Sequence, residues 1–284
     1  MKQRLEASHP GLAVSLLPMS TRGDELLDRR LDQAGGKGLF VKELENALAD
    51  GRADIAVHSM KDVPADLPPG FVLAAIMQRE DPRDALVSNK YQALGEMKTG
   101  EVVGTSSLRR QAQIAERHPG LEVRLLRGNV ETRLAKLDRG EYDAANLAVA
   151  GLVRLGLAGR IRSRLDVTDS LPAPGQGAMG IECREGNHEL ISLLKSLNDP
   201  VTETCVRAER AVSRALGGSC TVPLGAYAEP APGGLRLRAL VASLDGRRIA
   251  RADCEGGDAA ELAGRAVSEL RRQGADEILS ALGS

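Results

Sequence analysis

The stretch from Asp54 to Pro64 reads DIAVHSMKDVP, and it decides how the first part of the chain folds. Its apolar opening, 55–57, is typical of a buried strand, and Pro64 prevents the strand from continuing because proline has no N–H to donate. Ligands of open α/β sheets bind beyond the carboxyl ends of the strands, which is where Lys61 and Asp62 stand. The pair is therefore a candidate site, although a solvated surface turn would have the same sequence.

The residues before this stretch indicate further α/β structure. Residues 2–11 predict a helix, 12–19 (LAVSLLPM) a strand, and 40–51 (FVKELENALADG) an amphipathic helix that ends at Gly51. The glycine-rich GGKGLF at 35–40 is a weak candidate for a phosphate loop because it lacks the spacing of that motif. The alternation of strand and helix predicts an α/β domain.

The same alternation restarts after residue 100 and predicts a second α/β domain. Strands are expected at 101–104, 121–128 and 142–151, with helices at 108–118 and 129–140. Residues 105–107 can cap the first of these helices. The Pro- and Gly-rich segment 170–184 ends in the strand-like AMGIEC, which fits a crossover back to the first domain.

From about Asn198 the pattern predicts a small α+β domain. The expected elements are a helix at 201–218, strands at 221–230, 234–243 and 247–256, and one final helix at 258–279. The expected domains are therefore 1–77 together with 178–197, then 83–171, and finally 200–284.

Composition excludes several classes of function. The 284 residues have a net charge of -1, contain 2% aromatic residues and have no Trp, so neither DNA binding nor stacking on nucleic-acid bases is supported. The four cysteines form no metal-ligand pattern, and no run reaches the roughly 20 apolar residues of a membrane helix. The charged start lacks an apolar signal core, so a reducing cytoplasm with free thiols is expected.

Polar residues also follow the expected strands of the second domain, where arginines outnumber acids. Arginine pairs best with carboxylates and phosphates, so the ligand expected between the two domains carries several negative groups. Asp62 would stay ionised among these cations and could stabilise a developing positive charge. The residues are Thr105, Ser106, Ser107, Arg109, Arg110, Arg127, Gly128, Asn129 and Arg133.

Each of these features also has a plain structural interpretation. The SSLRR stretch at 106–110 can be a helix cap followed by a solvated helix face. His58 is expected to be a packed or capping histidine rather than a ligand. Cys220 could be an ordinary buried thiol, but it lies between glycines and a proline, where packing rarely demands sulfur.

Eight motifs in order resemble the porphobilinogen deaminase family, also called hydroxymethylbilane synthases, over almost the whole chain. They are GGKGLFVKELE (35–45), DIAVHSMKDVP (54–64), QREDPRDA (78–85), GTSSLRR (104–110), LRGNV (126–130), LAVAGL (147–152), PGQGAMGIECR (174–184) and GGSCTVPLG (217–225). The resemblance implies an α/β fold with two periplasmic-binding-protein-like, doubly wound domains and a small C-terminal α+β domain.

The resemblance also implies a transferase that condenses four porphobilinogen molecules head to tail into hydroxymethylbilane and releases ammonia. A dipyrromethane primer, the cofactor, would be attached by a thioether to Cys220, because a soft sulfur nucleophile traps an electrophilic methylene carbon. Asp62 matches the family's catalytic aspartate. A cytoplasmic monomer without a metal is expected.

The resemblance also implies which residues bind the cofactor and the substrate. The active-site loop is expected to include Lys37 and Phe40. Residues that match the family's contacts to cofactor and substrate are Lys61, Thr105, Ser107, Arg109, Arg110, Arg127, Asn129, Arg133, Arg154 and Gln176.

The chain departs from the family in one respect that leaves alternatives open. Members normally begin with a strand that carries an R-x-S motif, and this chain opens inside the helix that follows it. The expectation is a misassigned start codon or a fragment, with the Met1 form unstable or poorly active. The alternatives are thus a truncated, inactive family member, or a two-lobed binding protein for polycarboxylate small molecules.

Overall fold

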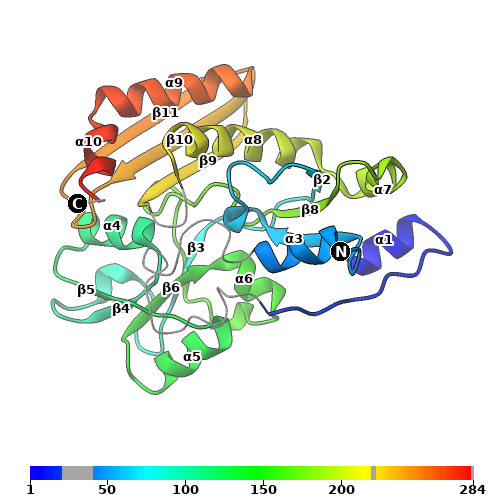
Figure 1. Ribbon diagram of the computed structural model, residues 1–284. Helices are drawn as coiled ribbons and strands as arrows, with labels where there is room; N and C mark the ends of the chain where they lie inside the picture. The colour runs from blue at the N-terminus through cyan, green and yellow to red at the C-terminus, as the bar shows by residue number, and fades with distance from the viewer. Residues whose placement is uncertain (21–40, 219–221, 283–284) are drawn as a thin grey trace.

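The computed structural model describes residues 1–20, 41–218 and 222–282, which build three separate sheets (Figure 1). The first sheet has the order β1 (Ile55–Ser59), β8 (Met179–Arg184) and β2 (Phe71–Ile76), with β8 antiparallel to both neighbours. Because β8 follows all the strands of the second sheet along the chain, the predicted crossover back to the first sheet is confirmed.

Short helices pack around the first sheet. They are α1 (Lys2–Ser8), α3 (Lys42–Ala49) and α7 (His188–Leu194), with the 3-10 turns η1 (Met60–Asp62) and η4 (Lys195–Leu197). Its core contains Leu5, Ile181, Cys183 and Leu194. Gly51, predicted to end the helix now seen as α3, has φ +70°, a conformation that favours glycine.

The second sheet is mixed. Its order is β5 (Glu122–Arg124), β4 (Val102–Gly104), β6 (Ala144–Ala148), β3 (Asp84–Val87) and β7 (Ser163–Arg164). The first three strands are parallel to one another, whereas β3 runs antiparallel to β6 and β7. Its helices are α4 (Leu108–Arg117), α5 (Val130–Asp138) and α6 (Val149–Arg154), with the 3-10 turns η2 (Leu94–Glu96) and η3 (Ala158–Arg160).

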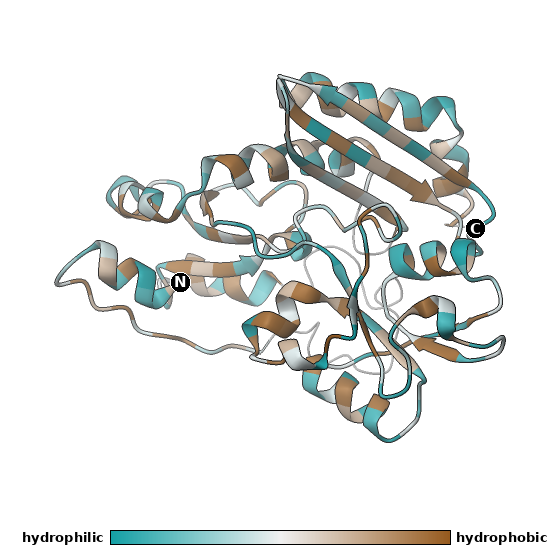
Figure 2. Cartoon of the chain, turned by 180° about the vertical axis from the view of Figure 1, so that it is seen from behind, coloured by the Kyte–Doolittle hydropathy of each residue, from teal (hydrophilic) through white to brown (hydrophobic). Residues whose placement is uncertain are grey.

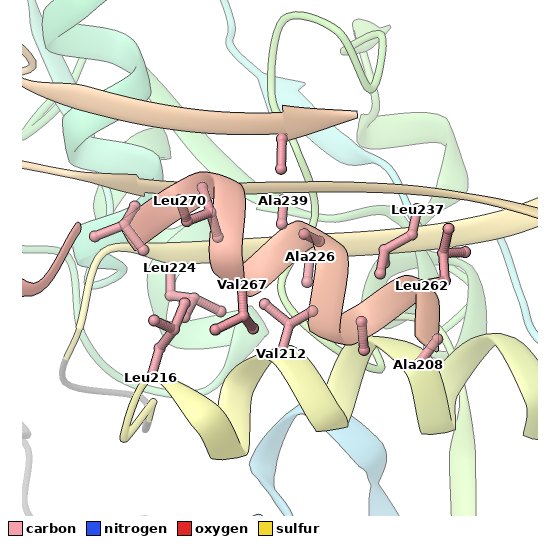
Figure 3. Close-up of a cluster of buried hydrophobic side chains, with 14 of the residues drawn as sticks. Ala208, Val212, Leu216, Leu224, Ala226, Leu237, Ala239, Leu262, Val267 and Leu270 are labelled. Atoms are coloured by element: carbon pink, nitrogen blue, oxygen red, sulfur yellow. The ribbon is translucent and has the colours of Figure 1, made fainter. Parts of the chain in front are cut away.

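The third sheet is an antiparallel meander of β9 (Leu224–Ala231), β10 (Gly234–Ala242) and β11 (Ile249–Gly256), and its strands alternate in hydropathy (Figure 2). Helices α8 (Pro200–Ala215) and α9 (Ala259–Arg272) cover one face, where Val212 of α8 meets Val267 of α9 (Figure 3). The mixed α/β class with a small C-terminal α+β part is therefore confirmed.

Three predicted elements differ from the structure. The strand predicted at 142–151 ends at Ala148, and its last three residues begin α6. The final helix is broken, because Gly274 has φ +88° and a separate helix, α10 (Ala275–Ser280), follows it. The prediction of a strand at 12–19 is wrong: the segment leaves α1 and runs outside the first sheet (Figure 1), with Leu16 and Leu17 69% and 52% exposed. An apolar segment becomes a strand only when a neighbouring strand completes its hydrogen bonds, and the sequence pattern does not supply that neighbour.

Among the described residues, no helix is both long and apolar enough to cross a membrane.

The second face of the third sheet rests on α4. Leu240 and Ala242 of β10 share a buried cluster with Ala112 of α4 and with Leu171. The turn between β10 and β11 makes the closest approach: a Cβ at Gly246 (φ +69°) would lie 2.5 Å from the backbone nitrogen of Glu116. Only glycine allows this contact without displacing backbone.

We predict that Gly246→Ala lowers the free energy of unfolding by about 1–3 kcal/mol, because the new methyl group meets the α4 backbone and the left-handed conformation disfavours alanine. The matched control is Gly264→Ala on the exposed face of α9, where a Cβ meets nothing within 4 Å. That change should stabilise by up to about 1 kcal/mol, since alanine is the better helix former. Urea unfolding compares the two, and equal stabilities would contradict the tight contact at Gly246.

Candidate active site

The turn that carries Lys61 and Asp62 is anchored by apolar residues on both sides. Met60 is almost fully buried, and its N–H donates to the Ala178 carbonyl at 3.0 Å. Val63 is also buried, and its N–H donates to the Met60 carbonyl at 3.3 Å. The side chains of Lys61 and Asp62 therefore stay partly exposed at the carboxyl end of β1, as the sequence predicts.

Three arginines of the second sheet and its helices lie close enough for Arg133 to feel the charges of the other two; we call Arg110, Arg127 and Arg133 the arginine group. The pKa of Arg133 is lowered to about 10, first by burial and then by the charges of Arg110 and Arg127, while the charge of Asp62 opposes the shift. Arg133 is therefore a buried guanidinium in a region that holds two further cations and Asp62. Such a region favours a ligand with negative groups.

Local hydrogen bonds place the arginine group. Thr105 follows β4, and its Oγ1 accepts from the N–H of Ser107 at 3.2 Å. The Ser107 hydroxyl in turn caps α4, which confirms that 105–107 can start a helix. At the next strand end, Asn129 caps α5, and Arg133 Nε donates to the Gly128 carbonyl at 2.7 Å.

Asp84 is the counter-ion of Arg109 and of Arg110, a member of the arginine group. Its fully buried carboxylate accepts from Arg109 Nη1 and from Arg110 Nη2, both at 2.7 Å. The Ser170 hydroxyl donates to it at 2.7 Å and the Gln176 amide at 2.9 Å. Burial alone would raise the pKa of Asp84, but the two guanidinium groups hold it well below its usual range. Two cations share one anion, so a net positive charge remains.

The structure thus brings three of the expected binding residues together around Asp84. Arg109, Arg110 and Gln176 are 3%, 5% and 1% exposed, and each hydrogen-bonds this carboxylate. Asp84 was missed at the sequence level. The available signal was an aspartate that opens the apolar stretch Asp-Ala-Leu-Val, which forms a strand buried at all four positions.

A second buried carboxylate, Glu209, was also missed. It lies on α8 beside the apolar residues Cys205, Ala208 and Val212, and an acid on the edge of such a stripe indicates a buried ion pair. Its oxygens accept from Arg79 Nη1 at 2.6 Å and Nη2 at 3.0 Å. They also accept the N–H groups of Gly175 at 2.7 Å and Ala228 at 2.8 Å.

Gly175, whose N–H donates to Glu209, also packs against the turn that carries Asp62. A Cβ at Gly175 would lie 2.8 Å from Met60 Cβ and 3.2 Å from the Lys61 nitrogen, so the chain packs directly on that turn. Two residues further along the chain, the Gly177 carbonyl accepts a hydrogen bond from Arg154 Nη2 at 2.5 Å. The pKa of Arg154 is lowered by burial.

The other residues considered in the sequence either have a structural role or lie outside the described residues. His58 Nε2 lies 2.7 Å from Glu182 Oε2, and both side chains are buried, so His58 is a packed histidine. Lys37, Phe40 and Cys220 lie outside the described residues. Within the described ranges, no cluster of three or more His, Cys, Asp or Glu side chains could hold a metal ion.

Comparisons with known families match nearly the whole chain. The model of the porphobilinogen deaminase, dipyromethane cofactor binding domain, matches residues 1–192, and that of the porphobilinogen deaminase C-terminal domain matches 203–272. A porphobilinogen deaminase of Thiobacillus denitrificans is 58% identical over 99% of this chain and 93% of its own length. Those of Paraburkholderia phymatum and Chromobacterium violaceum are 59% and 57% identical, over 98% and 99% of this chain and 86% and 92% of theirs.

Solved structures show a weaker likeness. A periplasmic substrate-binding protein of an ABC transporter from Coxiella burnetii has a TM-score of 0.41 at 18% identity, covering 72% of this chain and 87% of that one. A likeness of this size carries no argument about function.

We predict that Asp84→Asn lowers the free energy of unfolding by about 3–5 kcal/mol, because it leaves two buried guanidinium groups without a counter-ion. Urea unfolding measures the change. The control is Asp253→Asn, which removes an Asp–Arg pair with Arg236 that is exposed on the third sheet and should matter far less.

The pH dependence gives a second check on Asp84. Its folded pKa lies below the unfolded value, so its contribution is complete above about pH 5 and is lost as the pH falls below about 4. The stability difference between wild type and Asp84→Asn should therefore be flat near neutrality and shrink in acid. A difference that grows in acid would contradict the ionised, paired state.

Proposed function

The chain belongs to the porphobilinogen deaminase family, and we propose that Asp62 and Cys220 carry out the family's reaction in it. The family condenses four porphobilinogen molecules head to tail into hydroxymethylbilane with release of ammonia, and it uses a dipyrromethane cofactor. The observation that supports our assignment most directly is that the Asp62 carboxylate, at the carboxyl end of β1, acts on Arg133.

The donors near Asp62 suit both the cofactor and its substrate. Each porphobilinogen unit brings one acetate and one propionate, so a growing chain accumulates negative charge. Guanidinium groups pair with carboxylates through two parallel hydrogen bonds. We propose that the contacts come from Lys61, Thr105, Ser107, Arg109, Arg110, Arg127, Asn129, Arg133, Arg154 and Gln176.

The residues of this set differ in which hydrogen bonds they already make within the protein. Arg109, Arg110 and Gln176 would share their donors between a ligand carboxylate and Asp84, so the two arginines supply positive charge and Gln176 a neutral donor from fixed positions. Arg133 donates one N–H to a backbone carbonyl, and the charge of Asp62 acts on it. Lys37 and Phe40 are proposed to belong to a loop that closes over the site.

The chemistry proposed for Asp62 follows from its charge. As the substrate's C–N bond breaks and ammonia leaves, positive charge develops on the pyrrole, and a fixed carboxylate stabilises it. Asp62 also accepts pyrrole N–H groups and takes the proton that is lost when the new C–C bond forms. When bound, the dipyrromethane supplies the acceptor carbon to which each unit is joined.

We further propose the domain division 1–77 with 178–197, 83–171 and 200–284, which three separate sheets with their own buried clusters support. Cys220 would stand between α8 and β9 in the third domain. A monomer in the cytoplasm is proposed, and the free thiols of Cys183, Cys205 and Cys254 suit a reducing compartment.

A two-lobed binding protein for polycarboxylates could use the same arginines. It would have no use for a carboxylate among them, because that charge weakens the binding of anions. The match to both domain models of one enzyme family favours the enzyme over this alternative.

We predict that Asp62→Asn lowers kcat for release of ammonia from porphobilinogen by about 10²–10⁴-fold, the usual contribution of a proton-transfer residue. Asp66→Asn is the control, because Asp66 lies in the same loop with a side chain 76% exposed. It should keep at least half of the wild-type rate.

Two results would contradict the proposal. A wild-type rate in Asp62→Asn would remove Asp62 from the reaction. Binding of porphobilinogen by the wild type without any release of ammonia would favour the binding protein or the inactive family member.

A further inference from the structure

Arg210 of α8 holds the loop that follows Asp62. Its Nη1 donates to the Val63 carbonyl at 3.0 Å, and its Nη2 donates to the carbonyls of Pro64 at 2.7 Å and Ala65 at 3.1 Å. One guanidinium thus fixes three consecutive peptide groups, which no point charge such as a lysine ammonium can match in geometry.

Among the described residues Arg210 hydrogen-bonds no acid, although the charge of Asp66 acts on it. In the described part of the chain its hydrogen-bond partners are all carbonyl oxygens, and the neighbouring Asp66 pairs instead with Arg214 at 2.9 Å. The pKa of Arg210 is lowered to about 10 by burial and then by repulsion from Arg214. Arg210 is therefore a half-buried cation whose hydrogen bonds hold the loop and do not form a salt bridge.

An apolar contact holds the same turn from its other side. Val206, one helical turn before Arg210, is fully buried in a cluster with Met60 and Val63, the residues on either side of Lys61 and Asp62. The Asp62 turn is therefore attached to α8 at two points one turn apart.

Helix α8 also leads to Cys220. It ends at Ala215, about 7–8 Å along the helix axis from Arg210, and Gly217, with φ +62°, follows. In sequence, Cys220 follows the end of this helix by five residues.

We propose that Arg210 is a positioning residue that holds the turn carrying Asp62 on α8. This inference rests on the proposed function, in which each reacting ring must meet Asp62. Asp62 follows β1 of the first sheet, whereas α8 packs on the third sheet, so the position of Asp62 relative to α8 depends on the contact between α8 and the 63–65 loop. Arg210 itself touches neither substrate nor cofactor.

The test compares Arg210→Gln and Arg210→Lys with Arg214→Gln as the matched control. Arg214 lies one turn later, donates to the Ala65 carbonyl at 2.8 Å, and is 57% exposed. We expect Arg210→Gln to lower kcat about 10- to 100-fold, the cost of misplacing reacting groups by about 1 Å, with KM changed by less than about threefold. Arg210→Lys should recover little, and Arg214→Gln should resemble the wild type.

Hydrogen exchange gives a readout that does not depend on activity. The amide of Val63, which donates to the Met60 carbonyl, reports on opening of the turn. When Arg210 no longer holds the carbonyls of 63–65, the turn opens more often, so this amide should exchange at least about tenfold faster in Arg210→Gln but not in Arg214→Gln.

The outcomes separate this inference from the proposed function. If Arg210→Gln keeps the wild-type kcat, or if its Val63 amide exchanges at the wild-type rate, the positioning role is overturned while the function stands. If the wild type releases no ammonia, the proposed function fails, and exchange alone then decides whether Arg210 holds the loop. A raised KM with unchanged kcat would also overturn positioning, because it would show a binding role instead.

Discussion

The structure depends on one buried carboxylate, Glu209, which joins three parts of the chain. Arg79 belongs to the segment that leaves the first sheet for the second, Gly175 to the segment that returns, and Ala228 to the third sheet. Burying an ion is costly unless every oxygen is paired, and here two charge-assisted bonds from Arg79 and two backbone N–H groups complete the carboxylate. The same segment presses Gly175 against the Asp62 turn. The relative placement of the sheets and the exposure of Asp62 therefore follow from the same contact.

The site itself is a region where positive charge is only partly compensated. Asp84 neutralises one of its two arginines, and Asp62 is the carboxylate that acts on Arg133. The lowered pKa of Arg133 means that the free protein bears an electrostatic cost that an anionic ligand would relieve. A site built for polycarboxylates is expected to give up stability in this way, and Asp84 limits the loss by holding Arg109 and Arg110 together.

Features that depend on neighbouring residues could be predicted from the sequence. Features that depend on residues far along the chain could not. Local signals were sufficient for the Ser107 and Asn129 caps, for the end of α3 at Gly51, and for the order of the strands along the chain. The residues of the arginine group were also identified, because they follow strand ends. Asp84 and Glu209 were missed because their partners lie 19 to 130 residues away, and no local pattern names them. The strand expected at 12–19 failed for the same reason, since its hydrophobicity does not supply a neighbour.

We propose that this chain builds its own primer on Cys220 and extends it at Asp62. The decisive experiment is intact mass spectrometry of the purified 284-residue chain beside its Cys220→Ser variant. We expect the wild type to be heavier than its sequence by two linked pyrrole units and the variant to carry no such addition. A wild type at its unmodified mass, or an addition that persists without the Cys220 sulfur, would contradict the proposal.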